Sequence, residues 1–104
     1  MSKKIVRNPL AEHDLDDLAY YLSRKSLRIA LRFLDAAEVT FATLARKPSL
    51  GGSWESDNPM YHNMRVWPIK GFENHLIFFR AIEGGIEVIR VLHAARDIES
   101  VFAP

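Results

Sequence analysis

The side chains of this sequence that could do chemistry are mostly cations, and several lie among apolar residues in the second half of the chain. Arg65, Arg90 and Arg96 are candidate contacts for a phosphate or for a macromolecular target, because a guanidinium group binds phosphate and carboxylate oxygens through paired hydrogen bonds. A structural ion pair with Asp97 or Glu87 is an equally good interpretation of Arg90, which lies in an otherwise apolar run. The residue types therefore favour binding, and the role of Arg90 stays open.

The sequence around His93 resembles a catalytic cluster, because histidine titrates near neutral pH and an arginine and Asp97 follow closely. We favour a structural interpretation, in which His93 and Asp97 pair and fix the turn after the last strand. The other histidines, His13, His62 and His75, show no close metal-ligand spacing, and the chain has no cysteine. The sequence therefore predicts no catalytic residue, no metal site and no cofactor.

Length and composition predict a single globular domain over residues 1–104. A chain of 104 residues can bury one modest core, and 48% hydrophobic with 26% charged residues is ordinary for a folded protein. The lack of cysteine fits a reducing compartment, and no apolar run has the length of a membrane span or of an export signal. We therefore expect a cytoplasmic protein with no membrane partner. A net charge of +1 does not by itself imply a polyanionic partner.

The apolar periodicity predicts a strand followed by two helices. The strand lies within Lys3–Arg7, and Asn8 then caps a helix whose first position is a proline. That helix ends near Arg24. Ser26 caps a second helix, which ends at about Lys47 because a proline follows. The short connection makes the two helices an antiparallel hairpin.

The second half of the chain predicts an antiparallel meander after a polar loop at Gly51–Tyr61. Three β-branched and aromatic runs separated by glycines are Met64–Ile69, His75–Ile82 and Ile86–His93. Ala94–Phe102 forms a helical turn or tail. The expected fold class is α+β: a helical hairpin packed on a small antiparallel sheet, in the order β-α-α-β-β-β with a short C-terminal helix or tail. The first strand joins this sheet at an edge or at its centre.

The meander carries apolar side chains on both faces. The alternation places Ile77, Phe79, Ile89 and Val91 on one face and Leu76, Phe78, Val88 and Leu92 on the other. One helical hairpin can cover only one face, so we expect a second chain to bury the remainder. The faces of Arg80 and Arg90 depend on the length of the turn at Gly84-Gly85 and stay open.

Five strings along the chain carry a family resemblance. Ala11–Leu15 opens the first helix, Phe33–Ala36 lies in the second, Leu44–Pro48 closes it and Met64–Pro68 begins the meander. The most specific string, Ile89–Ile98, runs from the last strand into an Arg-x-Leu-His-x-x-Arg-Asp turn. Together they resemble the ParE-type toxins of the RelE/ParE superfamily over nearly the whole chain.

That superfamily contains a RelE-like branch of ribosome-dependent mRNA endonucleases and a ParE-like branch of gyrase poisons, so the residues must decide between them. RelE-like enzymes place lysines on the first strand of the meander, arginines on the following strands and a tyrosine in the tail. Here His62–Ile69 contains Arg65 but no lysine. His75 stands where an arginine would open the next strand, and Phe102 holds the tail position. These differences favour the non-nuclease branch.

The resemblance implies the toxin component of a type II toxin–antitoxin system, which inhibits DNA gyrase and is neutralised by direct binding of a ParD-like antitoxin. The candidate antitoxin contacts are aromatic and apolar: Tyr20, Tyr21, Trp67, Phe72, Phe79, Ile89 and Val91. The implied assemblies are a toxin homodimer or a toxin–antitoxin heterotetramer. Two alternatives stay open, a RelE-like mRNA interferase and an inactive relative that only binds an antitoxin.

Overall fold

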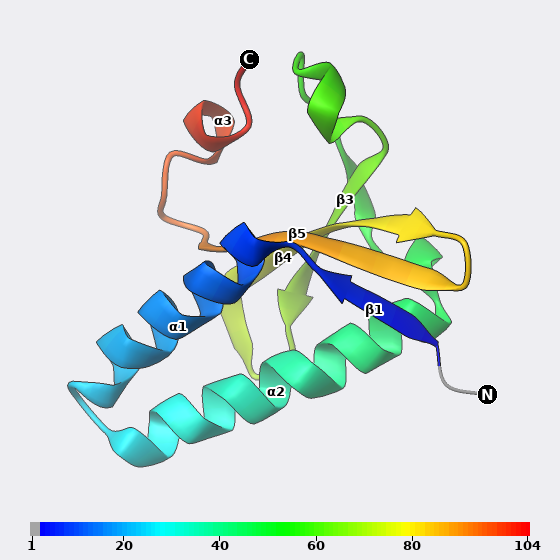
Figure 1. The fold of residues 1–104 in the computed structure, drawn as a ribbon. Helices are drawn as coiled ribbons and strands as arrows, with labels where there is room; N and C mark the ends of the chain where they lie inside the picture. Colours follow the sequence, from blue (N-terminus) through cyan, green and yellow to red (C-terminus); the bar gives the residue numbers. More distant parts are fainter. Residues whose placement is uncertain (1–2) are drawn as a thin grey trace.

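The computed structural model describes residues 3–104, which form a five-stranded sheet with two long helices on one face (Figure 1). The strands are β1 (Lys4–Arg7), β2 (Gly52–Trp54), β3 (Met64–Ile69), β4 (Phe72–Ile82) and β5 (Gly85–His93). The helices are α1 (Pro9–Ser23), α2 (Leu27–Arg46) and α3 (Ile98–Val101), with two short 3-10 turns, η1 (Pro48–Leu50) and η2 (Pro59–Tyr61). The predicted α+β order is confirmed, with β2 as an additional strand.

Both long helices begin at their predicted caps. Asn8 Oδ1 accepts a hydrogen bond from a first-turn N–H at 2.9 Å, and Ser26 Oγ accepts one at 3.3 Å. α2 stops before Pro48, which disfavours a helical conformation at Lys47. The short connection at residues 24–26 turns α2 back along α1, as expected. Across residues 3–104, no helix is both long enough and apolar enough to cross a membrane.

The sheet order is β1-β5-β4-β3-β2, and β3, β4 and β5 are antiparallel as predicted. β1 lies at one edge and is parallel to β5, so the whole sheet is mixed. Lys4 pairs with Gly85, where an added Cβ would lie 1.8 Å from the Lys4 carbonyl oxygen. Gly85 is therefore the first residue of β5, and the absence of a side chain there lets the β1 backbone lie beside it. The turn is Glu83-Gly84 instead of Gly84-Gly85, with Gly84 at φ 82°.

The segment predicted as a loop, Gly51–Tyr61, contains β2 and η2. β2 pairs with Met64–Val66, and the ring centroid of Trp54 lies 5.4 Å from that of Phe78. The polar composition of this segment concealed a strand that depends on a long-range partner. β4 begins at Phe72, earlier than predicted. The predicted start was too late because the two residues after Phe72 are polar and exposed, and they interrupt the apolar pattern.

A β-bulge at Ile89 determines which side chains face the helices. Phe78 pairs with Arg90 and Phe79 pairs with Val88, so Ile89 is an extra residue on β5. Val88 consequently joins Phe79 on the helix side, whereas Ile89 lies with Phe78 on the second face. The faces predicted for Val88 and Ile89 were therefore wrong, because strict alternation does not survive a bulge.

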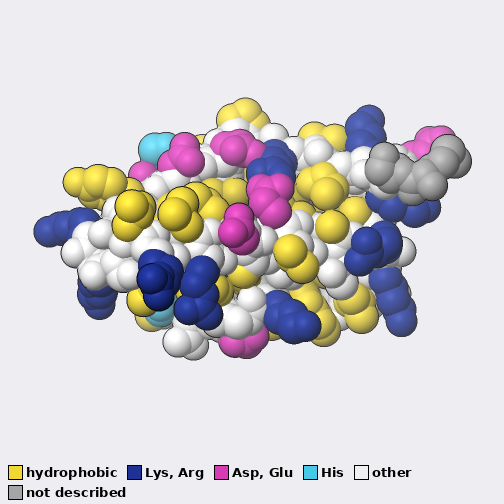
Figure 2. Space-filling model, turned by 90° about the horizontal axis from the view of Figure 1, so that it is seen from below, with side chains coloured by type: hydrophobic (Ala, Val, Ile, Leu, Met, Phe, Trp, Pro, Cys, Tyr) yellow, Lys and Arg dark blue, Asp and Glu magenta, His cyan; other side chains and the backbone are white. Residues whose placement is uncertain are grey.

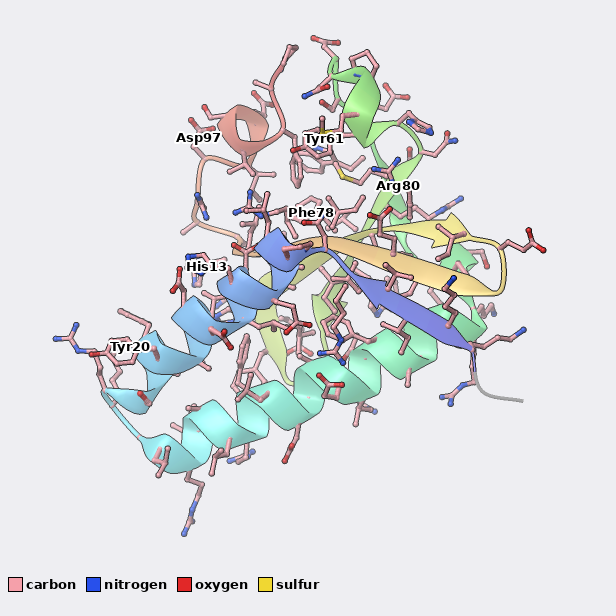
Figure 3. The ribbon with its side chains drawn as sticks, viewed as in Figure 1. His13, Tyr20, Tyr61, Phe78, Arg80 and Asp97 are labelled. Atoms are coloured by element: carbon pink, nitrogen blue, oxygen red, sulfur yellow. The ribbon has the colours of Figure 1, made fainter. Side chains whose placement is uncertain are left out.

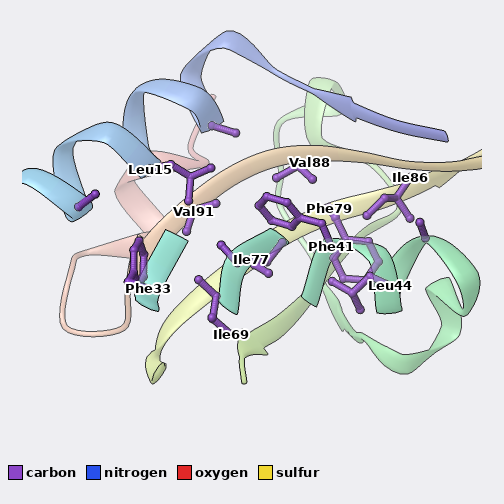
Figure 4. Packing of buried hydrophobic residues seen from close by; sticks show 14 residues of the cluster. Leu15, Phe33, Phe41, Leu44, Ile69, Ile77, Phe79, Ile86, Val88 and Val91 are labelled. Carbon is purple, nitrogen blue, oxygen red and sulfur yellow. The ribbon is translucent and has the colours of Figure 1, made fainter. Parts of the chain in front are cut away.

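The main core lies between the two helices and the sheet (Figure 4). Its large, fully buried members include Phe33, Phe41, Leu44, Ile69, Ile77, Phe79, Ile86 and Val88. Arg7 on β1 forms ion pairs with Glu12 of α1 and Glu38 of α2, and its guanidinium lies 5.1 Å from the Phe41 ring centroid. β1 is thereby joined to both helices as well as to β5.

The second face of the sheet is covered by the C-terminal segment of the same chain. Phe102 is 1% exposed, and its ring centroid lies 4.8 Å from that of Phe78 and 4.9 Å from that of Tyr61. Met64, Ile89 and Leu92 complete this buried cluster. Ser56 and Asn58 donate hydrogen bonds to carbonyls of the last residues. The expectation that a second chain must bury this face is therefore wrong.

A buried carboxylate attaches α1 to the edge of β5. β1 pairs with β5 only as far as Val88, and beyond that point Asp14 Oδ2 accepts the backbone N–H of Val91 at 3.0 Å. The same carboxylate accepts hydrogen bonds from Arg90 Nε at 2.7 Å and from Arg90 Nη2 at 2.9 Å. The Asp14 side chain is 6% exposed. Asp14 therefore takes the place of β1 where β1 no longer reaches.

We predict that Asp14→Ala lowers the free energy of unfolding by about 3–5 kcal/mol, because it leaves the Arg90 charge and the Val91 N–H buried without an acceptor. Replacing the pair together, with Asp14→Leu and Arg90→Met, should recover only the part of that loss caused by the buried charge, since the Val91 N–H still lacks an acceptor. Urea unfolding measures both effects, and the exposed Asp16→Ala on the same helix is the control. A loss below about 1 kcal/mol for Asp14→Ala would contradict this structural role.

His75 is buried among aromatic rings. It lies at the open end of the β4–β5 hairpin, away from the Glu83-Gly84 turn. Its ring centroid lies 5.0 Å from that of Phe33 and 5.0 Å from that of His93, its cross-strand partner. Burial, and then the neighbouring His93, lower the pKa of His75 below its ordinary value of 6.5, against a smaller opposing effect of the Phe72 backbone. The folded chain therefore binds a proton at His75 less readily than the unfolded chain.

We predict that the free energy of unfolding falls as the pH drops through 6.5, because the unfolded chain takes up the His75 proton first. His75→Phe should remove that part of the slope, which is at most about 1.4 kcal/mol per pH unit. Urea unfolding between about pH 7.5 and pH 5 measures it, with the exposed His13→Gln as the control. An unchanged slope in His75→Phe would refute the assignment.

Candidate functional site

Two arginines of the meander hold the segment that precedes β3. Arg65 Nη1 donates to the Gly51 carbonyl at 2.6 Å. Arg80 Nη2 donates to the Met60 carbonyl at 2.8 Å, and Arg80 Nε lies 3.3 Å from a carboxylate oxygen of Glu87 (Figure 3). Their guanidinium groups are thus engaged with backbone carbonyls and a carboxylate of the same chain.

Arg90 has a carboxylate partner, but that partner is Asp14 instead of Asp97 or Glu87. The hydrogen bonds that Arg90 donates to Asp14 raise the pKa of the Arg90 guanidinium, against the opposing effect of its burial. Its side chain is 14% exposed, whereas Arg96 is exposed in the turn between β5 and α3. Contact of Arg65, Arg90 or Arg96 with a target stays a prediction.

His93 and Asp97 lie in the same connection but do not bind each other in the way expected. His93 Nδ1 accepts the backbone N–H of Ala95 at 3.0 Å. Asp97 caps α3, where its carboxylate accepts the Ser100 N–H at 3.4 Å and the Ser100 hydroxyl at 2.6 Å. Each residue therefore stabilises its own part of the turn, and together these contacts lead the chain toward Phe102.

The seven candidate antitoxin contacts divide into three groups. Phe79, Ile89 and Val91 are at most 2% exposed and belong to the two buried clusters of the chain itself. Trp67 and Phe72 are partly exposed at the margin of the helix-side core. Tyr20 and Tyr21, at 70% and 57% exposed, lie near the end of α1. Only the last two groups present surface to a partner in this structure.

A groove runs between α2 and β3 beside Trp67. We call it the α2–β3 groove, and it is lined by Val39, Thr40, Thr43, Trp67, Pro68, Lys70 and Glu73. Its volume is about 280 Å³. Val39 is 61% exposed although it is apolar, and one cation and one carboxylate stand at the rim. Such a lining fits a partner segment that brings small apolar side chains and a charge.

The order of the strands explains why this groove stays open. β2 pairs with β3 only from Met64 to Val66, so the edge of β3 at Trp67–Ile69 has no strand beside it. Pro68 has no N–H to offer a further strand. The side chain of Thr40 receives the Lys70 N–H at 3.3 Å and holds the end of β3 against α2. The sequence indicated Trp67, but it did not indicate Val39 and Thr43, which look like an ordinary helix face.

A larger, acidic cavity of about 670 Å³ lies between the C-terminal segment and the chain before η2. It is lined by Trp54, Glu55, Ser56, Asp57, Asp97, Glu99, Ser100, Phe102, Ala103 and Pro104. Its two walls come from segments far apart in the sequence, so no local pattern indicated it. Within the described part of the chain, no group of three or more His, Asp or Glu side chains is arranged to hold a metal ion.

A family model described as the ParE toxin of the type II toxin–antitoxin system parDE matches residues 5–98. A solved structure of the "Chromosomal ParDE TA system from P. aeruginosa" has a similar fold, with a TM-score of 0.67 and 17% sequence identity. The likeness covers 88% of this chain and 96% of that chain. No curated protein sequence matches the chain. At this identity the solved structure supports the fold, whereas the family model spans most of the sequence. The chain therefore belongs to the ParE toxin family of type II toxin–antitoxin systems.

Proposed function

We propose that this toxin acts by binding DNA gyrase, without catalysing a reaction itself, and that a ParD-like antitoxin neutralises it by occupying the α2–β3 groove. The observation that carries the first part is that the arginines of the meander are engaged inside the chain. A nuclease of this fold would need such cations free to hold the scissile phosphate. Binding requires only an exposed surface, which the helices provide.

The residues that stand at the catalytic positions of RelE-like nucleases support the same conclusion. Phe102 is buried at the tail position and has no ionisable group, so it cannot protonate a leaving oxygen. His75 is 9% exposed, so its ring is not presented to a substrate, and burial lowers its pKa. Arg65 and Arg80 would have to release the Gly51 and Met60 carbonyls before they could bind a phosphate. We therefore prefer gyrase inhibition to mRNA cleavage.

The α2–β3 groove is the proposed antitoxin site because it combines Trp67 with exposed apolar surface on α2. We infer that the bound antitoxin segment is helical, since Pro68 prevents regular strand addition at this edge of the sheet. A helix laid along α2 would place small apolar side chains near Val39 and Thr43. It would place a carboxylate near Lys70, which stands at the rim beside Glu73.

We predict that Val39→Asp and Thr43→Arg each weaken binding of the purified antitoxin by about tenfold or more, because both fill the groove with a charged side chain. Val39 is exposed and Thr43 is partly exposed, so the fold should survive. Calorimetric titration measures the affinity, and Leu10→Asp, at another exposed apolar position, is the control. The two variants introduce opposite charges, so weaker binding in both indicates steric blocking, whereas weaker binding in only one indicates an electrostatic effect. Unchanged affinity in both would exclude the groove.

We predict that the purified toxin, added to gyrase and supercoiled plasmid, makes cleaved DNA accumulate in proportion to toxin concentration. In a translation mixture it should leave ribosome-bound mRNA intact. Prior addition of the antitoxin should abolish the DNA cleavage. Cleavage of ribosome-bound mRNA by the wild-type chain would instead support the RelE-like alternative, and harmless expression without antitoxin would support an inactive relative.

A further inference from the structure

The α1–α2 hairpin ends in an exposed apolar surface that the fold does not use. We call it the hairpin tip, and its apolar members are Tyr20, Tyr21, Leu27 and Leu31, which are 70%, 57%, 66% and 54% exposed. Figure 3 shows Tyr20 at the far end of the hairpin, away from the sheet. Large exposed apolar side chains gathered in one place mark an interaction surface more often than chance exposure does.

The same tip carries cations and no carboxylate. Arg24, Lys25, Arg28 and Arg32 fall within residues 18–34, a stretch without Asp or Glu. None of these four forms a salt bridge with any carboxylate of residues 3–104. Lys25 lies 5.5 Å from the Tyr21 ring centroid. Viewed from below, the molecule presents hydrophobic side chains together with Lys and Arg, and Asp and Glu lie nearer the middle of this face (Figure 2). The tip therefore offers a positive, partly apolar surface to a partner.

The hairpin tip is separate from the α2–β3 groove. Leu27 and Leu31 lie one turn apart on one side of α2, whereas Val39 projects about 120° away from Leu27 around the helix axis at 100° per residue. Their chemistry differs too, because one cation and one carboxylate line the groove, whereas four cations and no acid lie between Asp17 and Asp35. One partner seated in the groove would leave the tip uncovered.

We propose that the hairpin tip is the surface through which the toxin engages its protein target, and that the target presents carboxylates around an apolar centre. Tyrosine and arginine are the residue types that most often dominate the energy of protein interfaces. A nucleic-acid backbone would satisfy the cations but would leave the two leucines without apolar partners. The chemistry of the tip therefore favours an acidic protein surface. This inference rests on the proposed function only in requiring a macromolecular target.

The test compares two tip variants, Arg28→Glu/Arg32→Glu and Leu27→Ser/Leu31→Ser, with Arg46→Glu/Lys47→Glu at the other end of α2. All six side chains are exposed, so unfolding curves should match those of the wild type. Three quantities are measured for each variant: growth arrest on expression without antitoxin, affinity for immobilised gyrase, and affinity for the purified antitoxin. A gel shift with a short DNA duplex accompanies them.

Both tip variants should lose growth arrest and bind gyrase about tenfold or more weaker, while their antitoxin affinity and that of the control stay within about twofold of the wild type. Growth arrest by both tip variants, loss of antitoxin affinity, or DNA binding that depends on the tip would each overturn the inference. If the wild type arrests growth without binding gyrase and the tip variants do not arrest growth, the tip assignment stands and gyrase as target fails. A harmless wild type would defeat both.

Discussion

The three hydrogen bonds that Asp14 accepts determine how the helices lie on the sheet. β1 is too short to cover the whole edge of β5, and a bare edge would leave the Val91 N–H unpaired next to a helix. Asp14 supplies the missing acceptor and also receives Arg90 through two further bonds. Burying a carboxylate is costly, and these three donors offset that cost. The pair thus fixes α1, and through the hairpin α2, against β5.

The bulge on β5 lies directly before Arg90. Ile89 is the extra residue, and it lies on the second face of the sheet. There it helps to build the cluster that Phe102 closes. Both faces of the sheet are therefore covered by one chain of modest length. Surfaces for partners are left on the outside of the helices, at the α2–β3 groove and the hairpin tip.

Much of the fold could be predicted because its signals are local. Asn8 and Ser26 cap the helices through contacts within one turn, and the apolar runs of β3 to β5 alternate as strands do. The bulge and the Asp14–Arg90 pair could not be read in this way, since the partners are 76 residues apart in sequence. A signal was present, because Asp14 occupies a position in the apolar stripe of α1 beside Leu15, where a carboxylate needs a buried partner. Only the carboxylates near Arg90 in the sequence, Glu87 and Asp97, were considered as its partners, and so the role of Arg90 was left open.

If both proposed surfaces bind partners, their position along one helix has a consequence for neutralisation. Leu31 and Val39 are eight residues apart on α2, which corresponds to about 12 Å along its axis. A folded partner is wider than that distance, so an antitoxin seated in the α2–β3 groove would exclude a large target from the hairpin tip without touching the same side chains. Competition of this kind needs no conformational change in the toxin. It agrees with a chain whose two clusters are closed by its own residues.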